Sequence, residues 1–338
     1  MLVTETPLHP TGTGATLMPA EKFGAEVCSQ PVPAASAGYS HYLALDGPRL
    51  PSLAFGSLGP QLNPGPSLSM QLTDRDVAII ELVARYRAVR ADQVQLALFS
   101  PGAASRCQRR LTLLVRNHYL DRLPRRQVSD PAVYILSRRS TLGNRLVRAR
   151  LGDELFRRHM TKFGSLPHQL AINDLRVRVE RSCRELGWEL RQWLTAEGLL
   201  GRLPDKGLVP DAYFHLLRAD GSGLACFLEL ERASKSLAVV RSKLQRYASL
   251  YRHGRDETSQ SSRLVLFVFD EVFGTGRDRR PAMAAVEAAR LGVTNARFAS
   301  LTAIKNADPM SCFTDALWLP AGEQPLVPLF PLGSGATT

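Results

Sequence analysis

Apolar periodicity begins near residue 73 and divides the chain into a segment that cannot build a core and one that can. Residues 1–70 contain 10 of the 22 prolines, and no 3.6-residue or 2-residue apolar period persists there. This composition is typical of a disordered tail. We also expect a loose tail over residues 319–338, which are again rich in Pro and Gly. The remaining length predicts two domains, over residues 71–150 and 160–312.

Three helices and a strand hairpin are predicted in the first domain. Thr73 can cap a helix that has acids in its first turn. Residues 91–99 and 103–118 also have helical patterns, separated by Pro101 and Gly102. Two short strand-like runs follow, at residues 119–120 and 133–136, around a turn. This order predicts a winged helix-turn-helix domain over residues 71–150.

Arginine is concentrated in this domain. Residues 85–160 hold 17 arginines, no lysine and 5 acidic residues, an excess of 17 − 5 = +12 that equals the net charge of the whole chain. A planar guanidinium can make two hydrogen bonds to a phosphate or a guanine. We therefore expect double-stranded DNA as the partner. The alternative is a solvated basic surface. RNA is disfavoured, because no aromatic stacking platform accompanies the arginines.

The third predicted helix can be given a phase. At 100° per residue, Cys107, Leu114 and Val115 fall about 40–60° from Leu111 and form a buried face. The opposite face carries side chains that can hydrogen-bond bases and phosphates in a major groove. The predicted DNA-binding residues are those of this face and of the later turn: Ser105, Arg106, Arg109, Thr112, Arg116, Arg125 and Arg126.

Several classes of protein are disfavoured by what the sequence lacks. The five cysteines have no C-x-x-C spacing, so no zinc site is expected, and their odd count suits a reducing compartment. No apolar run approaches 18 residues, and no leader sequence is visible. We expect a cytoplasmic protein that does not bind membranes. The absence of a G-x-x-x-x-G-K-[ST] motif disfavours a P-loop helicase. The scattered histidines disfavour a relaxase with a histidine triad.

Residues 168–300 alternate between helical and strand patterns. The predicted order is α-β-β-β-α-β-α-β, which indicates a mixed α/β domain within an α+β chain. Asp211 is expected on one strand, and Glu229 and Glu231 lie two apart on the next, so that both face the same side. If the hairpin pairs normally, Asp211 lies near them.

Three converging carboxylates would suit Mg²⁺ or Mn²⁺, so Asp211, Glu229 and Glu231 are the predicted metal ligands. With a nearby lysine, such a site could activate water against a phosphodiester. The alternative is that these acids are solvated, or paired with Arg232 or Lys235. We interpret His168 as a helix-start or packing residue.

Two resemblances add to these patterns. Pro210-Asp211, a hairpin and Glu229-Leu230-Glu231 resemble the core of the PD-(D/E)xK nuclease superfamily, with the departure that Glu231 occupies the lysine position. The resemblance implies that Lys235 or Lys243 would take the role of this lysine and complete the catalytic set. Lys243 to Tyr247 is similar to the Q-x-x-x-Y helix motif of its exonuclease-type members, with lysine in place of glutamine. The resemblance implies a nuclease-like domain, either active or retained only for binding.

The chain also resembles the replication-relaxation family over about residues 72–300. The matching stretches are short and occur in order: residues 72–76, 168–174, 209–212, 229–234 and 243–247. Family members usually have Glu-x-Asp-Arg-Gly-Thr where this chain has Glu-Leu-Glu-Arg-Ala-Ser.

The second resemblance implies a DNA-binding accessory protein in plasmid replication, relaxation or conjugative mobilisation. Its implied protein partner is a relaxase or a replication protein. The sequence leaves two alternatives open: a metal-dependent endonuclease of PD-(D/E)xK type, and a winged-helix transcriptional regulator.

Overall fold

The computed structural model describes most of the chain after residue 69. The described ranges are 70–124, 130–137, 141–159, 166–203, 205, 207–232, 236–253, 261–270, 278–309, 311–322 and 324–330, without the side chains of residues 141–142, 153–159 and 261–262. The predicted N-terminal tail lies outside these residues, apart from Met70. In the described part, no helix combines the length and apolar character needed to cross a membrane.

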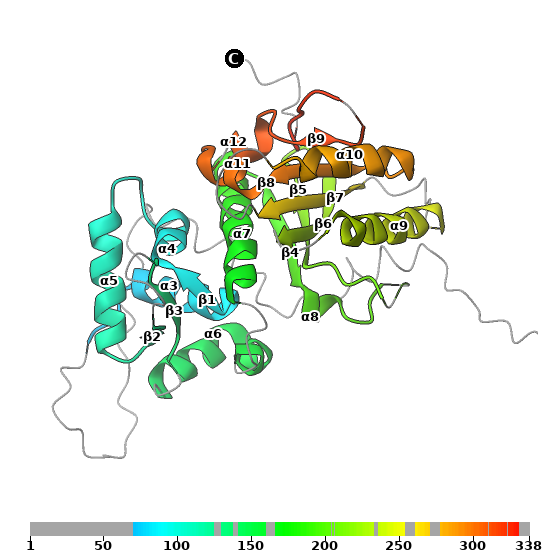
Figure 1. Ribbon diagram of the computed structural model, residues 1–338. Helices are drawn as coiled ribbons and strands as arrows, with labels where there is room; N and C mark the ends of the chain where they lie inside the picture. Colours follow the sequence, from blue (N-terminus) through cyan, green and yellow to red (C-terminus); the bar gives the residue numbers. More distant parts are fainter. Residues whose placement is uncertain are drawn as a thin grey trace, which may run out of the picture.

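Residues 74–136 form a small module of helices and a three-stranded sheet (Figure 1). Its elements are α3 (Asp74–Tyr86), β1 (Ala88–Arg90), α4 (Ala91–Leu98), α5 (Ala104–Arg116), β2 (Leu120–Arg122) and β3 (Val133–Leu136). The strands are antiparallel in the order β1-β3-β2. Thr73 caps α3 as predicted, and its backbone N–H donates to Asp76 Oδ2 at 2.8 Å.

Two elements of this half were missed by the sequence analysis. Strand β1 has only three residues, all buried, and it pairs with β3 rather than with a sequence neighbour. Helix α6 (Thr141–His159) packs against α3 and β3 and is interrupted at Gly152, where φ is 81°. Because α6 is rich in arginine and contains this glycine, its sequence shows no clear apolar face, although Val147 is fully buried.

Helix α7 (Leu166–Leu186) lies between the small module and a second, larger sheet (Figure 1). Its Val177 belongs to the apolar core of the small module, whereas Leu175 and Val179 belong to the core of the large sheet. The predicted boundary at residue 160 separates two chain segments, but α7 packs on both sides of that division.

The large sheet has six strands in sequence order (Figure 1). They are β4 (Glu189–Thr195), β5 (Ala212–Leu217), β6 (Gly223–Arg232), β7 (Ser261–Asp270), β8 (Ala296–Ser300) and β9 (Leu319–Pro320). Strands β6, β7 and β8 are parallel, and the remaining neighbours pair antiparallel. The predicted mixed α/β class is confirmed. Asp211, expected on a strand, instead precedes the first residue of β5.

Helices cover both faces of this sheet. One face of the sheet packs against α7 and the two short helices between β8 and β9. The other face packs against the helix that follows β6 and the helix that follows β7. The helices of this region are α8 (Ala196–Leu199), α9 (Leu237–His253), α10 (Arg280–Arg290), α11 (Leu301–Asn306) and α12 (Ser311–Thr314).

The expectation of a loose tail after residue 318 is wrong for the described residues 319–322 and 324–330. Trp318 pairs with Val327 through two backbone hydrogen bonds of 3.1 and 2.8 Å, and β9 extends the sheet beside β8. Phe330 is 1% exposed and stacks on Phe313. The stacking of Phe313, Trp318 and Phe330 therefore packs this segment against the sheet region, despite the Pro and Gly content that suggested disorder.

Candidate functional site

Helix α5 presents a polar face to solvent. Cys107, Leu111 and Leu114 are buried, as the predicted phase requires. The side chains predicted to contact DNA are exposed at Ser105, Arg106, Arg109 and Arg116 and half-buried at Thr112. Figure 1 shows α5 at the outer edge of the small module, on the far side of α4 from α7. Their DNA contacts stay a prediction, and Arg125 and Arg126 lie outside the described residues.

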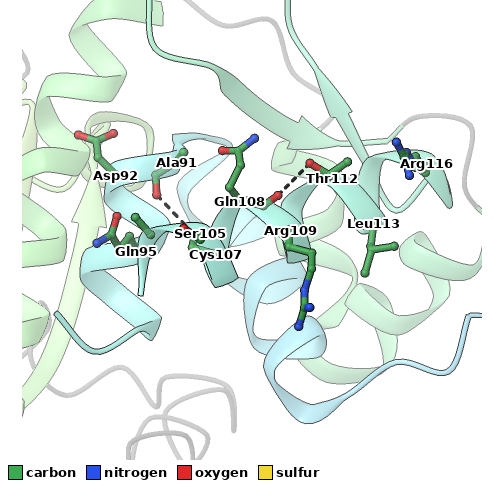
Figure 2. A pocket seen from close by; sticks show the side chains of 11 residues that line it. Ala91, Asp92, Gln95, Ser105, Cys107, Gln108, Arg109, Thr112, Leu113 and Arg116 are labelled. Carbon is green, nitrogen blue, oxygen red and sulfur yellow. Dashed lines mark hydrogen bonds between the residues drawn. The ribbon is translucent and has the colours of Figure 1, made fainter. Parts of the chain in front are cut away.

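A surface groove of about 730 Å³ runs along this face between α4 and α5 (Figure 2). Leu113, whose outward phase the amphipathic pattern does not explain, lies in its wall. The groove is lined by Ala91, Asp92, Gln95, Ala104, Ser105, Cys107, Gln108, Arg109, Thr112, Leu113 and Arg116. Gln95 and Gln108 were missed by the sequence analysis, which considered only the arginine-rich face of one helix.

Helix α5 is anchored from behind by one of its own arginines. Arg110 donates through Nε to Asp76 Oδ1 at 2.7 Å and also pairs with Asp76 Oδ2. Asp76 is fully buried and is the same residue that closes the N-terminal cap of α3. In addition, the Cys107 thiol contacts the Ala91 carbonyl oxygen at 3.7 Å (Figure 2). Arg110 therefore fixes the helix, while its neighbour Arg109 faces solvent.

A second polar cluster lies where β5 begins and β6 ends. Ala212 pairs with Leu228, so Asp211 reaches the end of β6, where its Oδ2 accepts a 2.8 Å hydrogen bond from the Leu230 backbone N–H. Asp211 Oδ1 contacts His168 Nε2 at 3.0 Å. His168 lies near the start of α7, and its side chain also belongs to this cluster.

Glu229 and Glu231 point from β6 toward α9, and both are buried. Lys243 Nζ donates to Glu229 Oε2 and to Glu231 Oε1, each at 2.5 Å. Tyr247, one helical turn further along α9, donates to Glu229 Oε1 at 2.8 Å. The structure therefore brings Asp211, Glu229, Glu231 and Lys243 together, and Lys235 lies outside the described residues.

The titration of this cluster follows from burial and charge. Burial raises the pKa of Glu229 to about 7; the Lys243 ammonium acts in the opposite direction, and the charge of Asp211 adds to the rise. The pKa of Lys243 is raised despite its burial, because two carboxylates favour the ammonium. For Asp211 the effect of burial is outweighed by His168, Lys243 and the Leu230 amide, and its pKa is lowered.

The predicted metal site is not found. In the described part of the chain, no group of three or more His, Cys, Asp and Glu side chains is arranged so that it could hold a metal ion. Both oxygens of Glu229 and one of Glu231 accept hydrogen bonds from Lys243 or Tyr247, and both oxygens of Asp211 are also engaged. As arranged, these residues do not fit Mg²⁺ or Mn²⁺.

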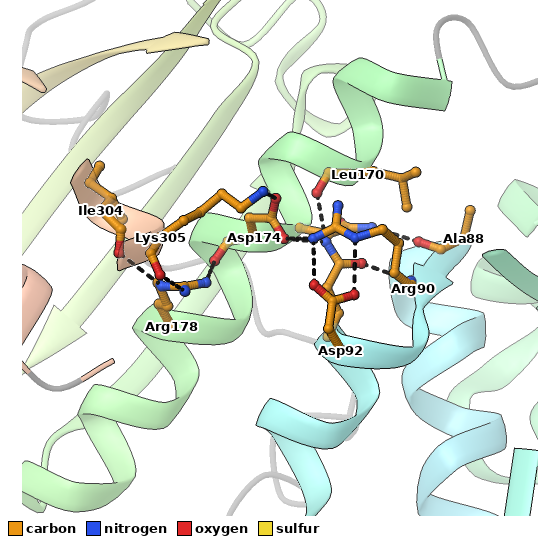
Figure 3. Close-up of polar contacts among 10 residues, drawn as sticks. Ala88, Arg90, Asp92, Leu170, Asp174, Arg178, Ile304 and Lys305 are labelled. Carbon is orange, nitrogen blue, oxygen red and sulfur yellow. Dashed lines mark hydrogen bonds and ion pairs between the residues drawn. The ribbon is translucent and has the colours of Figure 1, made fainter. Parts of the chain in front are cut away.

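Polar contacts on α7 join the two halves of the molecule (Figure 3). Asp174, which is 2% exposed, accepts from Arg90 at 2.5 Å and from Gln93 at 2.6 Å, both at the start of α4. One turn later, Arg178 donates to the carbonyl oxygens of Ile304 and Lys305, at 3.2 and 2.8 Å, in helix α11, which packs against β7 and β8. Helix α4, which forms one wall of the groove, is therefore connected through α7 to the large sheet.

In a comparison with known protein families, residues 80–263 match replication-relaxation. This range is 263 − 80 + 1 = 184 of the 338 residues, more than half of the chain. The chain belongs to the replication-relaxation family. Membership implies a role related to plasmid replication. Neither curated proteins nor solved structures give a significant match, and nothing in these comparisons supports a PD-(D/E)xK domain.

The replication-relaxation match covers both candidate sites. It begins within α3, includes α5 and α7, and ends within β7, so the groove and the cluster around Lys243 lie inside it. The predicted family is thus confirmed, over a narrower range than the expected residues 72–300. Helix α10 and the strands β8 and β9 lie beyond the match.

Proposed function

We propose that this replication-relaxation protein binds double-stranded DNA and acts as an accessory factor in plasmid replication, relaxation or conjugative mobilisation. In this proposal residues 71–150 are a winged helix-turn-helix domain, with α5 as the helix that enters the major groove. Element order supports the assignment, because α3, α4 and α5 are followed by the β2-β3 pair and β1 closes the small sheet.

The observation that carries the proposal is the solvent-facing row on α5. Arg106, Arg109 and Arg116 are exposed on one side of a helix whose other side is buried and anchored through Arg110. No acidic residue lies within α5. Arginine forks on a rigid helix suit guanine edges and phosphates, and the groove adds Gln95 and Gln108, whose amides suit adenine edges.

Titration of a labelled DNA duplex with the full chain tests the proposal. We expect Arg106→Ala combined with Arg109→Ala to weaken binding by about 30-fold or more, since each lost contact of this kind is worth about 1–3 kcal/mol and about 1.4 kcal/mol is tenfold. Arg191→Ala with Arg246→Ala is the matched control, because it removes the same charge from exposed positions of the large sheet region. Equal losses in both double variants would refute the assignment of α5.

A nuclease-like origin is proposed for the larger domain, because α7, β4, β5, β6, α9 and β7 follow the order of the PD-(D/E)xK core, with Asp211 directly before β5 and Glu229 on β6. If the endonuclease alternative holds, supercoiled plasmid is nicked in the presence of Mn²⁺ and Glu229→Ala abolishes the nicking. If the chain is instead a winged-helix transcriptional regulator, its DNA binding is expected only at the protein's own promoter.

A further inference from the structure

Lys243 lies where a cation shared by the two glutamates would lie. Its ammonium is 2.5 Å from Glu229 Oε2 and 2.5 Å from Glu231 Oε1. These two glutamates are side by side on one face of β6, 0% and 1% exposed. Two buried carboxylates at this spacing need a counter-charge, because an uncompensated buried charge is strongly unfavourable. Lys243 provides this charge from the chain itself.

The surrounding contacts hold Lys243 in this position. Its helix neighbours Leu244 and Tyr247 are fully buried, so α9 is fixed on the sheet and the lysine side chain is aimed at β6. The Tyr247 hydroxyl occupies the remaining oxygen of Glu229. Asp211, the third acid, is engaged separately by His168 and the Leu230 amide.

We propose that Lys243 is the resident cation of this site, and that the Glu229 and Glu231 carboxylates take a divalent cation only when the Lys243 ammonium is removed. The wild-type fold then has no dependence on divalent metals. The proposal is independent of DNA binding, because no residue of α5 contributes to the cluster.

Lys243→Met tests this idea, since methionine has a similar length and no charge. The melting temperature of the full chain is followed as Mn²⁺ is titrated to millimolar concentration at constant ionic strength. A cation that binds only the folded state raises the melting temperature. We expect no metal-dependent rise for the wild type and a rise of several degrees for Lys243→Met. Adding Glu229→Gln to Lys243→Met should abolish most of this rise.

Lys305→Met is the matched control, because Lys305 also lies beside a buried acid, Asp174, at 3.7 Å. It should respond to Mn²⁺ as the wild type does. Lys243→Gln is the second variant; its amide can still donate to a carboxylate, so it folds more readily if Lys243→Met does not.

Two results would overturn the proposal. One is a wild-type protein stabilised by Mn²⁺ as strongly as the variants. The other is a folded Lys243→Met or Lys243→Gln protein that ignores the metal. If neither variant folds alone, recovery of the fold upon adding Mn²⁺ supports the proposal, and failure to recover contradicts it.

Discussion

Glu229 is fully buried at the end of a strand, and its surroundings explain why it is tolerated there. Tyr247 and Lys243 satisfy its two oxygens, while burial and Asp211 favour the protonated form. Because its folded pKa of about 7 is above the unfolded value, the folded state binds this proton more tightly. Its contribution to the free energy of unfolding is therefore largest at low pH and falls as the pH rises through about 7.

Glu229→Gln should remove this dependence. We expect the stability of Glu229→Gln relative to the wild type to increase by on the order of 1–3 kcal/mol between pH 5 and pH 8, since one pKa unit corresponds to about 1.4 kcal/mol. Urea unfolding of both proteins across this range measures the difference. Glu189→Gln, which alters an exposed glutamate, is the control. A constant difference for Glu229→Gln would contradict the account of its burial.

Neighbouring residues of α5 show what single positions reveal in the sequence. Arg109 and Arg110 are the same residue type, and only the directions of their side chains differ, by 100° around the helix axis. Periodicity was enough to place Arg109 on the outer face. It could not show that Arg110 pairs with Asp76, because this contact joins residues 34 apart and depends on how α3 packs against α5. Likewise, the sequence placed Lys243 among the candidates but not between two glutamates.

At the scale of elements, amphipathic helices were predictable and pairing-dependent strands were not. Helices α3, α4 and α5 have apolar residues at helical spacing, and the bounds of α4 and α5 were predicted to within two residues. Strand β1 exists because β3 offers it a partner, and β9 exists because β8 does. Such short strands carry no periodic signal of their own.

The segment after Trp318 gives a prediction at this scale. Phe330 is 1% exposed among Phe313, Trp188 and the rest of the sheet core. We expect Phe330→Ala to destabilise the fold by about 3–5 kcal/mol, the usual cost of emptying a buried aromatic site. Leu326→Ala, at a position 47% exposed, should change it by less than about 0.5 kcal/mol. Equal effects in urea unfolding would show that the segment does not belong to the core.

At the scale of the whole molecule, α7 packs against both the small module and the large sheet, which were predicted as separate domains. The two predicted domains were assigned from chain length and from the second helix-strand pattern, which begins at residue 168. Periodicity does not show which face of a helix contacts another domain. Asp174 and Arg178 show that α7 contacts α4 on one side and the sheet region on the other. The orientation of the α5 face is therefore set by the larger domain as well as by its own core.

The arginine excess likewise acts over the whole molecule. The rest of the chain is close to neutral, so the positive field is concentrated in residues 85–160. Binding to duplex DNA should release one counterion for each phosphate neutralised, and log K should fall linearly with log salt concentration. The slope reports the number of phosphate contacts without any knowledge of the DNA sequence.

The salt dependence of duplex binding by the full chain tests the central claim most directly. Affinity is measured by fluorescence at several salt concentrations for the wild type, for Arg106→Ala with Arg109→Ala, and for Arg191→Ala with Arg246→Ala. With a slope of about −0.9 per contact, the first double variant should have a slope shallower by up to about 1.8, whereas the second should match the wild type. An unchanged affinity and slope in Arg106→Ala with Arg109→Ala would contradict DNA binding through α5.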